Sequence, residues 1–415
     1  MPGLSADLPC ACPLPAGESK FMSQTPPPLP PRASPLQTPP QALPEPWEYE
    51  DVARARFRTR ARRGLRRRWK LLAGFAIISA FYVAALLANF LAPYDANAQS
   101  RREPSAPAAT LRFRDTQGRW HARPFIYKLR LADPLARTYT EDTSARYPLA
   151  LFTRGDSYKL FGLFETDRHL FGVMSDARER ASTPRIYLLG TDELGRDRLS
   201  RLLSASRFSL SVGPLGTLLA GALGILIGCV SGYAGRRTDA LLMRAADAML
   251  ALPDLVLILA ARAAFPLVLP PTRAGMLLVT IFVAIGWAEM ARLARGLVLQ
   301  LREREFVLAA TSLGLTETRI LFRHILPNAA RPLVIQLSLM LPAFLLAETA
   351  LSFLGVGVQE PEASWGNMLA AANNLTLLRR EPLIILSPAI AIFVFVLAVR
   401  LVSDGLRSDE DRRAG

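Results

Sequence analysis

The sequence predicts an all-α polytopic membrane protein with six transmembrane helices and a β-containing insertion outside the membrane. Its 415 residues are 51% hydrophobic and 20% charged, and the apolar residues are gathered in long runs. A helix needs roughly 20 mostly apolar residues to cross the hydrocarbon core of a bilayer. Six runs reach that length: about 71–92, 209–233, 239–265, 276–299, 332–355 and 382–403. The long segment between the first two runs predicts the insertion, because it is too long for a structureless loop.

The chain begins with a segment, 1–53, that predicts a disordered, proline-rich tail. Fourteen of the 32 prolines fall by position 46, and no packed element tolerates that density. The next segment, 54–98, joins a basic block to the first apolar run. The block carries ten Arg and Lys residues from Arg54 to Lys70 and no acid. Beside an apolar run, it predicts contact with an anionic membrane surface rather than with nucleic acid.

The positively charged residues predict the orientation of the chain. Arginines precede run one, follow runs two and six, and fill the stretch between runs four and five. With six crossings these stretches share one side, which the positive-inside rule makes cytoplasmic. Both termini, including the tail 409–415, are then cytoplasmic, and segment 99–185 is outside. The third run is the weakest prediction, since four charged residues interrupt it and either pair with one another or face a wet interior. These are Arg244, Asp247, Asp254 and Arg262.

Segment 99–185 predicts a small folded module that contains strands. Phe125, Tyr127 and Leu129 alternate with other residues at the period of two that is typical of a strand. A turn-like sequence, Asp115 to Gly118, precedes them.

Small residues recur every four positions along the second run. Gly224, Gly228 and Gly232 belong to this stripe, which starts at Gly216 and includes Ala220. In lipid, such a stripe lets two helix backbones approach closely, so we expect these glycines to pack one helix tightly against another. The alternative is a membrane helix that is merely rich in glycine.

Sequence motifs for catalysis are absent. The chain has no Gly-Lys-[Ser/Thr] sequence for a phosphate-binding loop, no Gly-x-Ser-x-Gly and no His-Glu-x-x-His. Its three histidines lie too far apart for a helical metal motif, and three cysteines cannot form a disulfide framework. We therefore expect no catalytic residue, no metal and no cofactor bound by this chain.

The stretch between runs four and five, 303–327, predicts two short helices. The first ends at Gly314, which can adopt the left-handed capping conformation. Thr316 is a candidate N-cap of the second, and Pro327 is expected to end it. The second helix has an apolar face, formed by Ile320, Leu321, His324 and Ile325. Such a helix suits a socket on a cytoplasmic partner; the alternative is a helix that lies flat on the lipid surface.

Several motifs in this stretch and beyond it resemble one family. Ala309-Ala310, Gly314 and the sequence from Arg323 to Asn328 are similar to the cytoplasmic coupling loop of ABC-importer permeases of the dipeptide/oligopeptide/nickel branch. Three further stretches agree with that branch: 189–197, 347–355 and 364–366. The resemblance covers about 71–98 and 186–413. Leu308 stands where the family often has Glu, which puts in doubt any role that needs a carboxylate at that position.

The resemblance implies a type I ABC-importer permease fold, with a permease core at 186–408, in the inner membrane of a bacterium. It implies a second permease subunit, two cytoplasmic ATPase subunits that hold ATP-Mg, and a periplasmic or extracellular substrate-binding protein. The implied substrate is a dipeptide, an oligopeptide or a nickel complex. The implied ATPase-coupling residues are Ala309, Ala310, Gly314, Phe322, His324, Ile325, Leu326 and Pro327.

Two acids in the apolar runs are candidates for the pathway or a subunit interface. These are Glu348 and Asp247. The alternative for Glu348 is an interhelical hydrogen bond or pairing with an arginine. Two other functions also stay open: a membrane-anchored periplasmic enzyme with its chemistry in 99–185, and a receptor or scaffold that uses the same module.

Overall fold

The computed structural model describes residues 68–134, 136–160, 164–174, 183–233, 235–373, 378–379 and 381–407. The predicted proline-rich tail, most of the basic block and the tail 409–415 lie outside the described residues.

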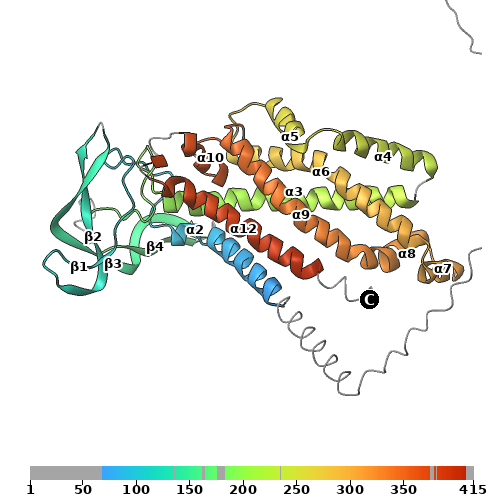
Figure 1. Ribbon diagram of the computed structural model, residues 1–415, viewed down its shortest axis with the longest axis horizontal. Helices are drawn as coiled ribbons and strands as arrows, with labels where there is room; N and C mark the ends of the chain where they lie inside the picture. The colour runs from blue at the N-terminus through green and yellow to red at the C-terminus, as the bar shows by residue number, and fades with distance from the viewer. Residues whose placement is uncertain are drawn as a thin grey trace, which may run out of the picture. The chain divides into compact units, whose positions relative to one another are not determined.

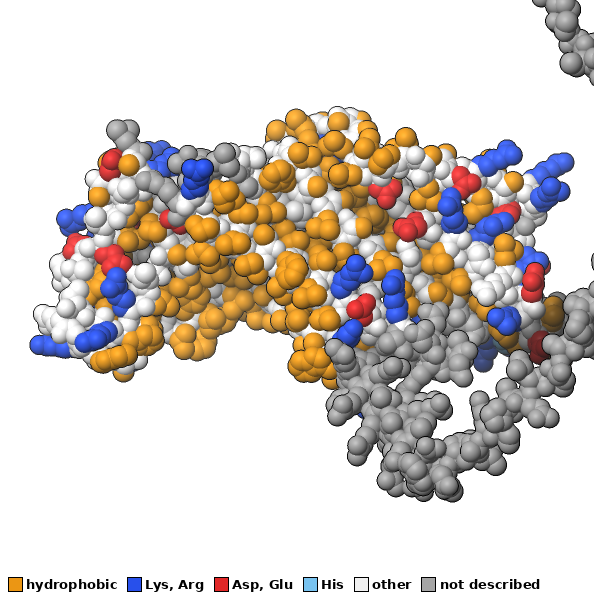
Figure 2. All heavy atoms as spheres, in the orientation of Figure 1, with side chains coloured by type: hydrophobic (Ala, Val, Ile, Leu, Met, Phe, Trp, Pro, Cys, Tyr) orange, Lys and Arg blue, Asp and Glu red, His pale blue; other side chains and the backbone are white. Residues whose placement is uncertain are grey.

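Among the described residues, five helices are long and apolar enough to cross a membrane (Figure 1). They are Arg68–Leu86, α3 (Arg198–Tyr233), α6 (Pro271–Arg302), the continuous helix Glu317–Phe353 that ends in α9, and α12 (Leu383–Arg407). Hydrophobic side chains cover the middle of the helices in Figure 2, whereas Lys and Arg side chains gather beyond it. The prediction of a helical polytopic membrane protein is therefore confirmed.

The prediction of one membrane helix over 239–265 is wrong. Two shorter helices occupy this run: α4 (Arg236–Leu250) and α5 (Asp254–Ala263). Pro253 separates them, because its ring removes a backbone donor and disfavours helical geometry at the preceding residue. The exposed side chains of α5 are largely apolar, with Val256 at 58% exposure, whereas α4 exposes charged residues such as Arg244 and Asp247 as well as Leu241 (69%).

The broken pair α4 and α5 still returns the chain across the bundle. Helices α3 and α6 pack in parallel: Gly216 lies against Phe282 at one end, and Gly232 lies against Val298 at the other. Two parallel helices that both cross a membrane require the chain between them to cross back. Figure 1 shows α4 and α5 making this return beside α6. Neither α4 nor α5 alone has the length of a candidate span, so this return is made by two short helices.

Four antiparallel strands fold between the first helix and α3. They are β1 (Arg112–Arg114), β2 (Trp120–Asp133), β3 (Thr138–Leu160) and β4 (Phe164–Val173), in the sheet order β1-β2-β3-β4. The middle of β2 is buried at Phe125, Ile126 and Tyr127. The sheet is linked to the helices because Ala92, just after α2 (Ala88–Leu91), places its carbonyl oxygen 2.5 Å from Nδ1 of His169.

Candidate functional site

The turn between α7 (Glu305–Ser312) and α8 (Glu317–Ile320) has the geometry of a Schellman motif. Gly314 has φ of +75°. Its N–H donates to the carbonyl of Thr311 at 2.9 Å, and the N–H of Leu315 donates to the carbonyl of Ala310 at 3.3 Å. Thr316 occupies the N-cap position of α8 in extended conformation, but its side chain makes no capping hydrogen bond. Backbone hydrogen bonds, rather than a side-chain cap, therefore close the turn between the two helices.

The prediction that Pro327 ends the second helix is wrong. Helix α8 continues through a π-helical turn, η1 (Leu321–Ile325), into α9 (Leu326–Phe353). The π-turn shifts hydrogen bonding by one residue, so the N–H of Leu326 bonds to the carbonyl of Leu321. Pro327 then lies in the first turn of α9, and the amide of Asn328 donates to the carbonyl of His324 at 2.6 Å. A proline without an N–H is tolerated in this first turn, and the π-turn and the Asn328 side chain supply hydrogen bonds to the nearby carbonyls of Leu321 and His324.

One face of this segment anchors it to the bundle. Val307, Ala310, Ile320 and Ile325 are each at most 5% exposed, and they pack with Cys229 of α3 and Val298 of α6 in one hydrophobic cluster. The apolar face predicted for the second helix thus points into the chain itself rather than towards a partner.

Four large apolar side chains of this segment are exposed: Phe306 (42% exposed), Leu308 (55%), Leu313 (81%) and Phe322 (61%), which we call the α7–α8 surface. Polar side chains such as Ser312 and Arg319 are exposed in the same segment. The predicted coupling residues are divided between buried and exposed positions. Ala310 and Ile325 are buried, His324 and Leu326 are half-buried, and Ala309, Gly314, Phe322 and Pro327 are exposed. Phe306 and Leu313 were not singled out from the sequence, although the apolar side chain of Leu313 next to a turn glycine was an available signal.

The three glycines singled out in α3 lie against α6. A Cβ at Gly224 would lie 2.5 Å from the carbonyl oxygen of Trp287, and one at Gly228 would lie 2.4 Å from that of Ala291. At Gly232 the nearest atom is a side-chain carbon of Val298, at 2.6 Å. Real Cβ atoms essentially never approach other atoms this closely, so the contact between the two backbones depends on the missing side chains.

The two candidate acids have different surroundings. Asp247, on α4, is exposed and pairs with Arg292 of α6. Glu348, on α9, is fully buried, and its Oε1 accepts a hydrogen bond from Ser352 at 2.8 Å. Its Oε2 has no hydrogen-bond partner among the described residues. The bond to Ser352 lies within α9, so it is neither the interhelical hydrogen bond nor the arginine pairing of the alternative, and the role of Glu348 stays a prediction.

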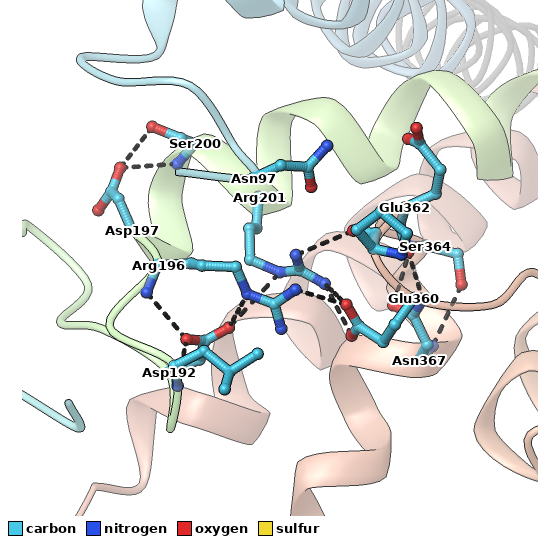
Figure 3. A network of polar contacts seen from close by, with 12 residues as sticks. Asn97, Asp192, Arg196, Asp197, Ser200, Arg201, Glu360, Glu362, Ser364 and Asn367 are labelled. Carbon is cyan, nitrogen blue, oxygen red and sulfur yellow. Dashed lines mark hydrogen bonds and ion pairs between the residues drawn. The ribbon is translucent and has the colours of Figure 1, made fainter. Parts of the chain in front are cut away.

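A second polar cluster lies near α10 (Trp365–Leu369), at the end of the helices away from α7 (Figure 1). Figure 3 shows Arg196 and Arg201 pointing at the same carboxylate, Glu360. Arg196 Nη1 lies 2.5 Å from Oε2, and Arg201 Nη2 lies 2.9 Å from Oε1. Asp192 also pairs with Arg196, at 2.6 Å. The sequence reasoning missed this network because its partners are some 160 positions apart.

No metal site is evident in the part of the chain that the structure describes: no group of three or more His, Cys, Asp or Glu side chains there could hold an ion.

Comparison with known proteins places these features in a family. Residues 224–412 match the profile of the binding-protein-dependent transport system inner membrane component, and residues 57–107 match the N-terminal TM domain of oligopeptide transport permease C. Two solved structures are less similar. An amino acid ABC transporter matches at 18% identity and a TM-score of 0.38, over 50% of this chain and 93% of its own. The MetNI methionine ABC transporter matches at 14% identity and a TM-score of 0.37, over 50% of this chain and 96% of its own.

Curated relatives match at higher identity. A putative peptide permease protein of Brucella suis is 39% identical over 55% of this chain and 74% of its own length. The oligopeptide transport system permease protein OppC of Bacillus subtilis is 38% identical over 54% and 71%. The di/tripeptide transport system permease protein DppC of Pseudomonas aeruginosa is 39% identical over 54% and 72%. With these relatives and the matching family profiles, the chain belongs to the inner-membrane components of binding-protein-dependent transport systems and is an ABC-importer permease.

Proposed function

We propose that this permease is one of the two membrane subunits of a peptide importer. A second permease, two cytoplasmic ATPase subunits and an external substrate-binding protein complete the transporter, and ATP-Mg is bound by the ATPases alone. The names of the relatives support a peptide as substrate, since they are described as peptide, oligopeptide or di/tripeptide permeases. The nickel complexes implied by the sequence resemblance have no such support.

The α7–α8 surface carries the proposal for coupling. Four large apolar side chains are exposed around one tight turn, and exposed apolar patches of this kind mark interaction sites. The buried face of the same segment holds it rigidly on α3 and α6. The α7–α8 surface is therefore held in a fixed position on the helices, from which it can bind in a socket on an ATPase subunit.

The continuous helix Glu317–Phe353 supports a route from this surface into the membrane. Its first residues form α8 beside the α7–α8 surface, and its later residues pack against α3 and α12. Because the helix is unbroken over 37 residues, a displacement of α8 by a closing ATPase pair moves α9 as a lever. Alternating access follows if this movement shifts one group of helices relative to another.

The orientation is part of the same proposal. The α7–α8 surface and both termini face the cytoplasm, the sheet faces the periplasm, and the chain lies in the inner membrane of a bacterium. The positive-inside rule supports this, because Arg236 and Arg237 at the start of α4 and the arginines between Arg302 and Arg323 lie on the α7 side.

Replacement of Gly314 by valine tests the coupling role. A Cβ there meets open space, so the effect is confined to the backbone: φ of +75° is strained for a β-branched residue by about 1–2 kcal/mol. We expect Gly314→Val to insert normally, to retain the second permease and to bind the ATPases weakly. Co-purification of the subunits and ATP-dependent uptake of a tripeptide measure these effects.

Gly355 offers a matched control for backbone strain. It also has φ of +75°, open space around its Cβ and the same pair of capping hydrogen bonds, but it follows α9 at the other end of that helix. Gly355→Val should leave ATPase co-purification unchanged. If Gly314→Val binds the ATPases as well as this control does, the coupling role is rejected.

A further inference from the structure

A cavity of about 950 Å³ opens beside the polar network at the α10 end of the helices. One part of its wall is apolar and the other is charged. The apolar part is formed by Leu194, Met368, Ala370, Ala371 and Ile384. The charged part comes from the residues that lead into α3 and from Glu360. Pockets for small ligands commonly combine a mainly apolar wall with a few convergent polar groups, in the size range of roughly 300–1,000 Å³.

Most charges around this cavity have partners. Arg196 and Arg201 share Glu360, and Asp192 binds Arg196 (Figure 3). Asp197 accepts hydrogen bonds from the N–H and the hydroxyl of Ser200, at 2.9 and 2.5 Å. Glu193 also makes a contact of its own. The paired groups leave little capacity for a ligand. Oδ1 of Asp197 is buried without a partner among the described residues, but Asp197 does not line the cavity.

Arg198 is different. It lines the cavity, it is only 3% exposed, and its Nη1 has no hydrogen-bond partner among the described residues. Asp192 pairs with Arg196 instead, and Glu381, whose carboxylate also acts on the charge of Arg198, makes an interaction of its own. No ion pair within the described part of the chain includes Arg198. A buried guanidinium nitrogen without a partner costs free energy and calls for an explanation. Its place in the wall of the cavity favours a ligand as that explanation.

We propose that Arg198 binds the C-terminal carboxylate of a peptide that enters this cavity. A guanidinium group presents two parallel N–H donors that match the two oxygens of a carboxylate. The apolar wall around Met368 and Ile384 then accepts the side chains of the peptide. This inference rests on the proposed function, because it takes the substrate to be a peptide and the α10 end to be the periplasmic entrance.

Photo-crosslinking to the assembled transporter tests the site. The probe is trialanine with a photoreactive diazirine side chain at its middle position, and mass spectrometry locates the labelled residues. We expect the label on α10 or near Ile384. Unlabelled trialanine should displace the probe at a concentration roughly tenfold or more below that needed of trialanine amide, because a charge-assisted hydrogen bond to a carboxylate is lost in the amide.

Variants assign this difference to one side chain. In Arg198→Gln the preference for the free acid should disappear, and Arg198→Lys should retain part of it. Arg130→Gln is the control, since Arg130 lies in β2 with its side chain 75% exposed. If Arg198→Gln fails to fold, the comparison of trialanine with trialanine amide still tests the proposal in the unmodified protein and in Arg198→Lys.

Three outcomes overturn the inference: equal displacement by acid and amide, a preference that persists in Arg198→Gln, or a label outside the cavity. ATP-driven uptake of trialanine by the unmodified transporter is measured in parallel. Uptake without labelling of the cavity rejects the carboxylate site and leaves the proposed function standing, whereas absence of uptake rejects the proposed function itself.

Discussion

The contact of α3 with α6 at Gly228 makes a quantitative prediction for Gly228→Ala. The single added methyl group would lie 2.4 Å from the carbonyl oxygen of Ala291, 2.6 Å from Cβ of Ala294 and 2.9 Å from the backbone nitrogen of Arg295. Ordinary van der Waals contact begins at 3.4 Å. Two of the three atoms belong to the backbone of α6 and cannot turn away as the end of a long side chain can. The helices must therefore separate by about 1 Å at this level.

The cost of that separation follows from the packing that it loosens. Insertion of extra methyl groups into a close-packed contact typically costs about 1–3 kcal/mol, which lowers the ratio of folded to unfolded protein by roughly 5- to 150-fold. Nearby residues above and below, such as Gly224 and Gly232, lie in the same stripe and lose contact as well. The larger side chain of Gly228→Leu should weaken assembly with the partner subunits in addition.

Reversible denaturation of the purified permease in mixed micelles measures this cost. Gly296→Ala is the matched control, because Gly296 lies in α6 and a Cβ there has nothing within 4 Å. We expect the unfolding free energy of Gly296→Ala to equal that of the unmodified protein or to exceed it by up to about 1 kcal/mol. If Gly228→Ala unfolds at the same denaturant concentration as this control, close backbone contact does not stabilise the α3–α6 pair.

Three further predictions concern the two ends and the interior of the helices. Glu360→Gln should lower the unfolding free energy by about 1–2 kcal/mol. This is less than the roughly 3–5 kcal/mol typical of a fully buried ion pair, because the Glu360 side chain is 54% exposed. Glu362→Gln is the control, and equal unfolding free energies of the two variants would argue against the network. A cysteine at Leu313, which is 81% exposed, should react with a membrane-impermeant thiol reagent only in inverted vesicles once the native cysteines are replaced, and reaction in intact cells would reverse the orientation. Glu348→Gln should retain tripeptide uptake and change the unfolding free energy by less than about 1 kcal/mol, since an amide is cheaper to bury than a carboxylate; lost uptake with unchanged unfolding would instead favour a role in the pathway.

The sequence by itself determined the class of the protein and the character of its turns. Membrane-spanning helices depend on the hydropathy of consecutive residues, so five of the six apolar runs correspond to helices of sufficient length. Gly314 was identified as a turn residue for a similar reason, because the steric cost of a positive φ is local to one residue. The coupling loop resemblance likewise rested on neighbouring residues such as Ala309 and Ala310.

Two errors came from proline, whose effect depends on its neighbours in space. The sequence predicts one helix across Pro253, but the structure has two helices that Pro253 separates. It also predicts the end of a helix at Pro327, which in the structure lies inside a continuous one. The break at Pro253 was within reach of the sequence, since proline disfavours helix at the preceding residue. The continuity at Pro327 was not, because it depends on the π-turn that carries α8 into α9.

Tertiary structure alone decided which face of each element is used. The apolar face of α8 is buried on Cys229 and Val298, so the exposed α7–α8 surface lies on the other side. The parallel packing of α3 on α6, the shared carboxylate Glu360 and the unpartnered Nη1 of Arg198 were equally out of reach. The physical reason is common to all of them. Hydropathy and turn sterics act between residues that are neighbours in the chain, whereas burial, ion pairing and the lack of a partner depend on which distant segments are brought together by packing.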